Sequence, residues 1–143
     1  MKTIAVAESC TGGLLSKLLT DNPGSSKYFM LGIVAYSNQA KKKILQIPAS
    51  ILSAKGAVSP EVACLMAKSV RKLAKVNFGV GITGIAGPAG GSKAKPVGTV
   101  FIAIDSRNNS ICKKFKLTGS RKSIREKTAL KALELLKLLI NKT

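Results

Sequence analysis

The chain has 143 residues, of which 45% are apolar, so it suits one globular domain with its own core and is not a disordered tail. It has no histidine and only six scattered carboxylates, which excludes Ser-His-Asp and Cys-His nucleophile systems, histidine metal sites and paired-carboxylate glycosidases. The net charge of +18 either attracts phosphate, on a nucleotide or a nucleic acid, or simply keeps the surface solvated.

Strands and helices alternate through the first half of the chain. A buried strand is predicted over 3–7, and leucines at helical spacing follow it up to a turn at 21–24. A second strand is predicted over 30–36, and a short helical stretch over 41–45 ends before Pro48. Ser59 and Pro60 then mark the start of a helix, because serine caps a first turn and proline suits its first position.

A strand, a glycine-rich loop, a hairpin and a long helix complete the chain. The third strand is predicted over 78–83 and leads into TGIAGPAGGSKAKPVGT at 83–99. Strands at 97–104 and 111–117 flank a turn at 106–109, and an amphipathic helix is predicted over 121–140. Together these elements predict an α/β fold with a mixed sheet covered on both faces, as one domain over 1–143.

Three turns follow the first three strands, at 7–13, 36–41 and 83–91. Ligand sites in α/β sheets gather beyond the carboxyl ends of parallel strands, so these turns converge if the strands are parallel. The loops match neither the Walker pattern nor GxGxxG. Ser9, in the first turn AESCTGG, either caps the helix that follows or acts as a nucleophile, with the Gly12 and Gly13 backbone stabilising an oxyanion.

Without histidine, a general base must come from a short list of lysine, tyrosine, cysteine and Glu8. A lysine serves only if its pKa falls through burial or through a nearby cation. Lys41 lies just past the second strand, and Lys42 and Lys43 are expected to help lower its pKa. The alternative is that this lysine run is a solvated helix start.

The cysteines and the chain ends indicate a cytoplasmic protein with free thiols, no metal and no membrane segment. Cys10, Cys64 and Cys112 are odd in number and widely spaced, unlike a disulfide framework or a zinc knuckle. No apolar run approaches the ~18 residues of a membrane span, and no signal-peptide pattern is visible. Cys10 is expected to point away from the site that Ser9 faces, because adjacent residues leaving a strand point in opposite directions.

Five blocks of the sequence resemble, in order, those of the CinA C-terminal domain family. The blocks are AESCTGGLLSKLLTDNPGSSKYF, GIVAYSNQAKK, GAVSPEVACLMA, TGIAGPAGGSKAKPVGTV and LTGSRKSIR. Members of that family act as nicotinamide-nucleotide amidohydrolases (NMN deamidases). The resemblance implies a three-layer α/β/α sandwich with a mixed five-stranded sheet. It also implies hydrolysis of nicotinamide mononucleotide to nicotinate mononucleotide and ammonia, by a Ser-Lys mechanism without metal or cofactor.

The family motifs assign roles to individual residues of this chain. Ser9 resembles the nucleophile and Lys41 its base, and Ser26 and Tyr36 would assist or orient them. The expected substrate contacts are Thr11, Gly12, Thr83, Gly84 and Arg121. Arg121 would bind the phosphate, for which its forked guanidinium is suited.

The chain also departs from the family pattern. Relatives usually carry a helix before the first strand, whereas this chain begins at the strand and lacks the amino-terminal pyrophosphatase-like domain of longer CinA proteins. Ala89 stands where relatives often place aspartate before the glycine pair. The apolar surface left without that helix predicts a homodimer. The alternative hypothesis is an impaired enzyme that binds nucleotides or nucleic acid, although the 4% aromatic content is low for stacking on bases.

Overall fold

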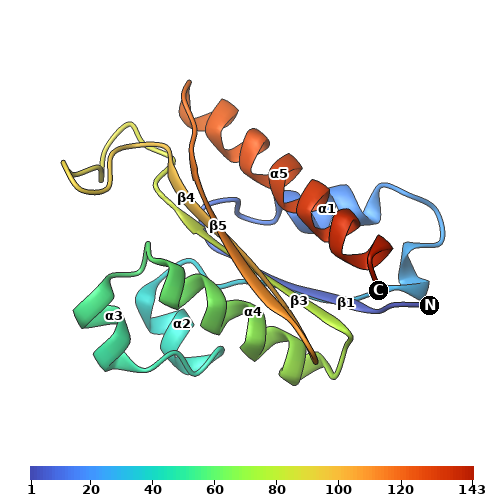
Figure 1. Cartoon of the computed structure of the whole chain (residues 1–143). Coiled ribbons are helices and arrows are strands. Elements are labelled where there is room, and N and C mark those ends of the chain that lie inside the picture. The colour runs from blue at the N-terminus through green and yellow to red at the C-terminus, as the bar shows by residue number, and fades with distance from the viewer.

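The computed structural model describes residues 1–143, and its strands form one mixed sheet in the order β2-β1-β3-β4-β5 (Figure 1). The strands are β1 (Ile4–Glu8), β2 (Phe29–Val34), β3 (Phe78–Gly84), β4 (Thr99–Ser106) and β5 (Ser110–Lys116). β1 pairs in parallel with β2 and β3, whereas β4 is antiparallel to β3 and forms the predicted hairpin with β5. The predicted mixed five-stranded sheet is therefore confirmed.

Helices cover both faces of the sheet and complete three layers (Figure 1). α1 (Leu14–Thr20) and α5 (Arg121–Asn141) lie on one face, and α2 (Asn38–Lys43), α3 (Ala49–Lys55) and α4 (Pro60–Ala74) lie on the other. A short 3-10 helix, η1 (Ser25–Lys27), connects α1 to β2. No helix combines the length and the apolar character needed to cross a membrane.

The observed helix boundaries follow from their caps. Ser59 accepts a hydrogen bond from the Val62 N–H and Pro60 is the first residue of α4, as predicted. α2 begins three residues earlier than predicted because Ser37 accepts from the Ala40 N–H and caps it there. α3, which directly follows Pro48, was not predicted, because its seven residues carry no apolar repeat long enough to reveal a helix.

The core lies on both faces of the central strands β1 and β3. All five residues of β1 are buried, and the first four form the apolar run expected between two parallel neighbours. On the α4 side, β3 presents Gly79 and Gly81, where an added side chain would collide with the carbonyl oxygens of Ala67 and Ala63. The backbone of α4 therefore rests directly on β3.

Candidate active site

A cavity of about 270 Å³ opens at the carboxyl ends of β1, β2 and β3. Its wall combines the turn after β1, the β2–α2 connection, the segment before α4, the glycine-rich loop after β3, and Arg121 at the start of α5. The three turns that follow the parallel strands thus do converge, because parallel strands end at the same edge of a sheet.

Ser9 and Lys41 meet at the base of this cavity. The Lys41 Nζ lies 2.9 Å from the Ser9 Oγ and 3.0 Å from each of two backbone oxygens, those of Ala35 and Tyr36. Carbonyl oxygens only accept hydrogen bonds, and a neutral amine has two N–H groups and one lone pair. If both N–H groups donate to the carbonyls, the lone pair is left for the Ser9 hydroxyl. This geometry suits a neutral lysine that takes a proton from serine.

The environment of Lys41 favours its neutral form. The side chain is buried, with 1% of its surface exposed, and it takes part in no ion pair. Burial lowers the pKa of Lys41 below its ordinary value of 10.5, and a charge on Cys10 would act in the opposite direction. The prediction that Lys42 and Lys43 lower the pKa of Lys41 is wrong. Both side chains are exposed, so water screens their charges.

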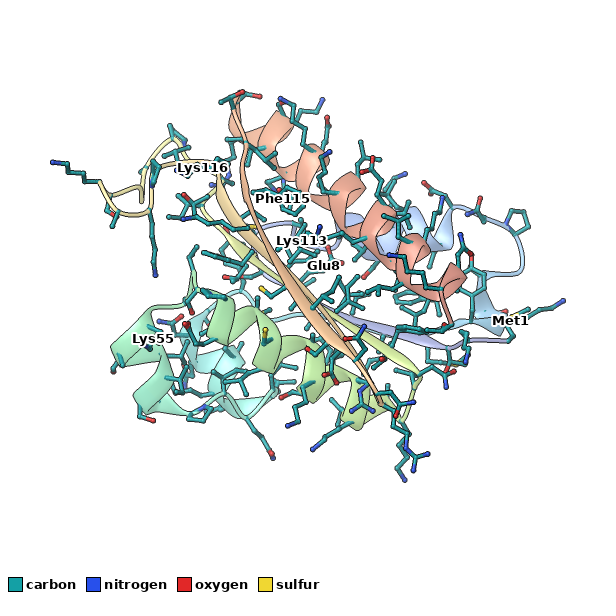
Figure 2. The ribbon with its side chains drawn as sticks, viewed as in Figure 1. Met1, Glu8, Lys55, Lys113, Phe115 and Lys116 are labelled. Carbon is teal, nitrogen blue, oxygen red and sulfur yellow. The ribbon has the colours of Figure 1, made fainter.

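Glu8 anchors the turn that follows it through hydrogen bonds. We define this turn, residues 9–13, as the nucleophile turn. This carboxylate is fully buried between the sheet and α1 (Figure 2). Its Oε1 accepts from the Thr11 hydroxyl at 2.6 Å and the Leu15 N–H at 2.9 Å. Its Oε2 accepts from the Ser16 N–H at 3.0 Å and the Ser16 hydroxyl at 2.7 Å. With four donors around it, Glu8 has a structural position and is not a free general base.

Two predicted contacts of the nucleophile turn are corrected by this arrangement. Thr11 is fully buried and its hydroxyl is bound to Glu8, so it does not line the cavity. The Gly12 N–H donates to the Ser9 carbonyl oxygen, so it is not free to bind an oxyanion. The Cys10 N–H donates to no backbone oxygen, and Cys10 lines the cavity. This amide replaces Gly12 as the candidate oxyanion donor.

Cys10 shares the cavity wall with Ser9, which differs from the expectation that only one of them would face it. The chain leaves β1 in a turn rather than as extended strand, so the alternation of side chains no longer applies. Burial raises the pKa of the Cys10 thiol to about 11, and the Arg125 charge offsets only part of that effect. The thiol is therefore protonated at neutral pH and is a poor nucleophile.

Arg121 closes the opposite side of the cavity. Its Nη1 donates to the Gly87 carbonyl oxygen at 2.7 Å, and its Nη2 donates to the Tyr36 hydroxyl at 2.8 Å. The Thr83 hydroxyl donates to the Ala57 carbonyl oxygen at 2.8 Å and joins β3 to the segment before α4. Gly84 also lines the cavity. Four predicted site residues, namely Tyr36, Thr83, Gly84 and Arg121, thus surround the Ser9–Lys41 pair.

Ser26 is the predicted site residue that the fold places elsewhere. It lies exposed in η1, before β2 begins at Phe29, and Phe29 pairs with Ile4 at the start of β1. Ser9 follows the other end of β1, so Ser26 lies at the opposite edge of the sheet and does not line this cavity. The prediction that Ser26 orients the Ser9–Lys41 pair is therefore wrong for a single chain.

Sequence reasoning missed Arg125, which contacts the nucleophile turn from α5. Its Nε donates to the Cys10 carbonyl oxygen at 3.0 Å, and its Nη2 donates to the Thr11 carbonyl oxygen at 3.1 Å. The available signal was its position four residues after Arg121, which places both arginines on one face of a helix. No group of three or more His, Cys, Asp or Glu side chains is arranged to hold a metal ion.

Comparisons with known proteins agree with this fold. The family model of the CinA C-terminal domain matches residues 1–140. A CinA-like protein of Geobacter sulfurreducens is 48% identical over 135 residues, covering 94% of this chain and 33% of that protein. The chain thus spans about a third of the length of the curated relatives it matches.

Solved structures are similar along almost the whole chain. The competence/damage inducible protein CihA of Agrobacterium tumefaciens has a TM-score of 0.94 and 41% identity, covering 96% of this chain and 85% of that one. A CinA superfamily protein of Escherichia coli has a TM-score of 0.92 and 32% identity, covering 96% of this chain and 80% of that one.

Proposed function

The chain belongs to the CinA C-terminal domain family, and from this premise we propose that it is an amidohydrolase of nicotinamide mononucleotide. The observation that carries the proposal is the 2.9 Å contact between the Ser9 Oγ and the Lys41 Nζ, inside a cavity of a chain that contains no histidine. The products would be nicotinate mononucleotide and ammonia.

The reaction follows from the contacts of Lys41. The neutral amine accepts the Ser9 proton while the Ser9 Oγ attacks the carboxamide carbon, and the amide oxygen becomes negatively charged. We assign the Cys10 N–H, which donates no backbone hydrogen bond and belongs to a residue of the cavity lining, to donate to that oxygen. The resulting ammonium of Lys41 then gives its proton to the departing nitrogen, which leaves as ammonia. Water attacks the acyl-serine ester with Lys41 again as base, which releases the acid and restores Ser9.

Arg121 is the residue we assign to the phosphate of the substrate. Its guanidinium lies at the cavity mouth, is exposed, and has no acidic partner. A guanidinium binds two phosphate oxygens in parallel, so part of its present bonding to Gly87 and Tyr36 would be exchanged for the phosphate. The net charge of +18 would raise the encounter rate with an anionic nucleotide.

The test is ammonia release from nicotinamide mononucleotide by the purified chain. We expect wild type to release ammonia and Ser9→Ala to release none. Ser53→Ala, which changes an exposed serine of α3, is the matched control and should retain full activity. Mass spectrometry of quenched protein should find the acyl group on Ser9. A folded wild-type chain that releases no ammonia from this substrate would exclude the proposal.

A second candidate function rests on the lysines of β5. Lys113, Lys114 and Lys116 are exposed at this edge of the sheet and form no ion pair, and Figure 2 marks Lys113 and Lys116 along the strand. Such a row of cations favours binding of nucleic acid or another polyanion. Retention of DNA or RNA at about 0.15 M salt would support this function, and loss of all binding at that salt concentration would remove it.

A further inference from the structure

We propose that Arg125 is a positioning residue, which holds the nucleophile turn in the conformation that brings Ser9 to Lys41. This inference rests on the proposed function through the assignment of Ser9 as nucleophile. Arg125 projects from α5 and binds two successive carbonyl oxygens of the turn, those of Cys10 at 3.0 Å and Thr11 at 3.1 Å. It takes part in no ion pair, so its charge is directed at the turn alone.

Gly12 makes room for this contact. A side chain added at Gly12 would place its first carbon 2.8 Å from the Arg125 Nη2, closer than such atoms approach in proteins. The guanidinium therefore packs against the bare backbone of the turn. Gly12 also has a φ of +59°, a conformation that side-chain-bearing residues rarely adopt. The glycine in the motif thus has a partner 113 positions further along the chain.

Glu8 and Arg125 act on complementary groups of the same turn. Glu8 accepts from the Thr11 hydroxyl and from N–H groups of α1, whereas Arg125 donates to carbonyl oxygens. The backbone of Ser9 is fixed as well, because its N–H donates to the Ile82 carbonyl oxygen of β3. A carboxylate, a guanidinium and a strand thus hold the turn from three directions, and only Arg125 comes from the last helix.

The geometry of guanidinium explains why arginine suits this position. Its N–H groups are fixed in one plane and reach two acceptors at once, whereas lysine carries a single compact charge on a flexible stem. Loss of the double contact would release the carbonyls of Cys10 and Thr11 but would remove no side chain of the cavity lining, because Arg125 itself does not line the cavity. The expected effect is therefore on the reactivity of Ser9 and not on substrate affinity.

The experiment compares Arg125→Ala and Arg125→Lys with a matched control, Lys127→Ala. Lys127 is a cation on the same helix that also donates to a backbone oxygen, that of Thr118 at 2.7 Å, but outside the nucleophile turn. The first readout is the rate at which a fluorophosphonate labels Ser9, measured by intact mass. In this reaction the Ser9 Oγ bonds to phosphorus, fluoride leaves, and Lys41 takes the serine proton. The second readout is kcat and KM with nicotinamide mononucleotide.

We expect Arg125→Ala to lower both the labelling rate and kcat by about 10- to 100-fold, with KM unchanged. Arg125→Lys should fall between wild type and Arg125→Ala, and Lys127→Ala should match wild type. Millimolar guanidinium ion should restore part of the labelling in Arg125→Ala. Circular dichroism verifies folding, and if Arg125→Ala does not fold, Arg125→Lys decides the question.

A folded Arg125→Ala that labels at the wild-type rate would overturn the inference, as would a rise in KM with unchanged kcat. If Arg125→Ala does not fold and Arg125→Lys labels at the wild-type rate, the inference is likewise overturned. If wild type labels at Ser9 but releases no ammonia, the proposed substrate is wrong and the labelling series still tests Arg125. If Ser9 of wild type is not labelled, the nucleophile assignment fails and the role of Arg125 fails with it.

Discussion

Replacing Lys41 with arginine keeps a positive charge beside Ser9 but removes the group that accepts its proton. At pH 7 a lysine with a pKa of 10.5 is neutral in only about one molecule in 3,000. Each unit by which burial lowers that pKa raises the neutral fraction tenfold. Lys41 is 1% exposed and has no carboxylate partner, so the neutral form is the one that its site favours.

The assay is kcat/KM for nicotinamide mononucleotide from about pH 5 to pH 10. Because the base must be neutral, the rate should rise about tenfold per pH unit below the lowered pKa of Lys41 and level off above it. Lys41→Arg and Lys41→Met should both lose about 100- to 10,000-fold. Lys42→Arg, which changes the exposed neighbour, should behave as wild type. Substantial activity in a folded Lys41→Arg, or a flat pH profile in wild type, would refute the reasoning.

The same pKa shift predicts the pH dependence of stability. A lysine whose folded-state pKa is lowered binds fewer protons in the folded chain than in the unfolded one, so unfolding takes up a proton. Between the folded-state pKa and 10.5, the free energy of unfolding should therefore rise with pH. Lys41→Met should lack this rise, and urea denaturation at several pH values measures it.

Other predictions concern the turn, the thiol, the core and assembly. Glu8→Gln replaces one acceptor oxygen with an NH₂ group that faces hydrogen-bond donors. The free energy of unfolding, measured by urea denaturation, should therefore fall by about 2–4 kcal/mol. Glu126→Gln, which changes an exposed carboxylate, should leave it almost unchanged. Cys10→Ala should keep most activity while Ser9→Ala abolishes it, and the reverse would reassign the nucleophile. Gly81→Ala makes a side chain collide with the backbone of α4, so the free energy of unfolding should fall by about 1–3 kcal/mol or more. Thermal unfolding measures this loss. We also propose that the chain forms a homodimer; a monomer mass by light scattering at micromolar concentration would contradict this.

Local patterns in the sequence were sufficient to predict the sheet and the meeting of its three turns. The apolar runs at β1 and β3 and the cap at Ser59 are short-range signals, and the convergence of the turns follows from parallel pairing alone. The contact between Ser9 and Lys41 was an expectation from the family resemblance, because Lys41 lies inside α2 and only the packing of that helix brings its side chain to Ser9.

The contacts that hold the turn were not predictable in the same way. Arg125 and the carbonyl of Cys10 are 115 positions apart, and no periodicity relates them. Glu8 looks like a strand residue with a free carboxylate, and only the packing of α1 shows that its oxygens are occupied. Ser26 belongs to a conspicuous motif, but motif membership does not say at which edge of the sheet a residue lies.

The backbone contact between α4 and β3 makes the strand that leads to the cavity stiff, whereas the loop after β3 is free to adjust. Because Gly79 and Gly81 let α4 rest on the strand itself, no side chain is available there to change rotamer and absorb a displacement. The hydrogen bond from Thr83 to Ala57 extends this stiffness to the cavity. The loop over residues 85–98, whose first part from Ile85 to Gly90 lines the cavity, has no helix or strand and is rich in glycine. Adjustment to ligands of different shape should therefore be confined to this loop, and its amides should exchange with deuterium long before those of α4.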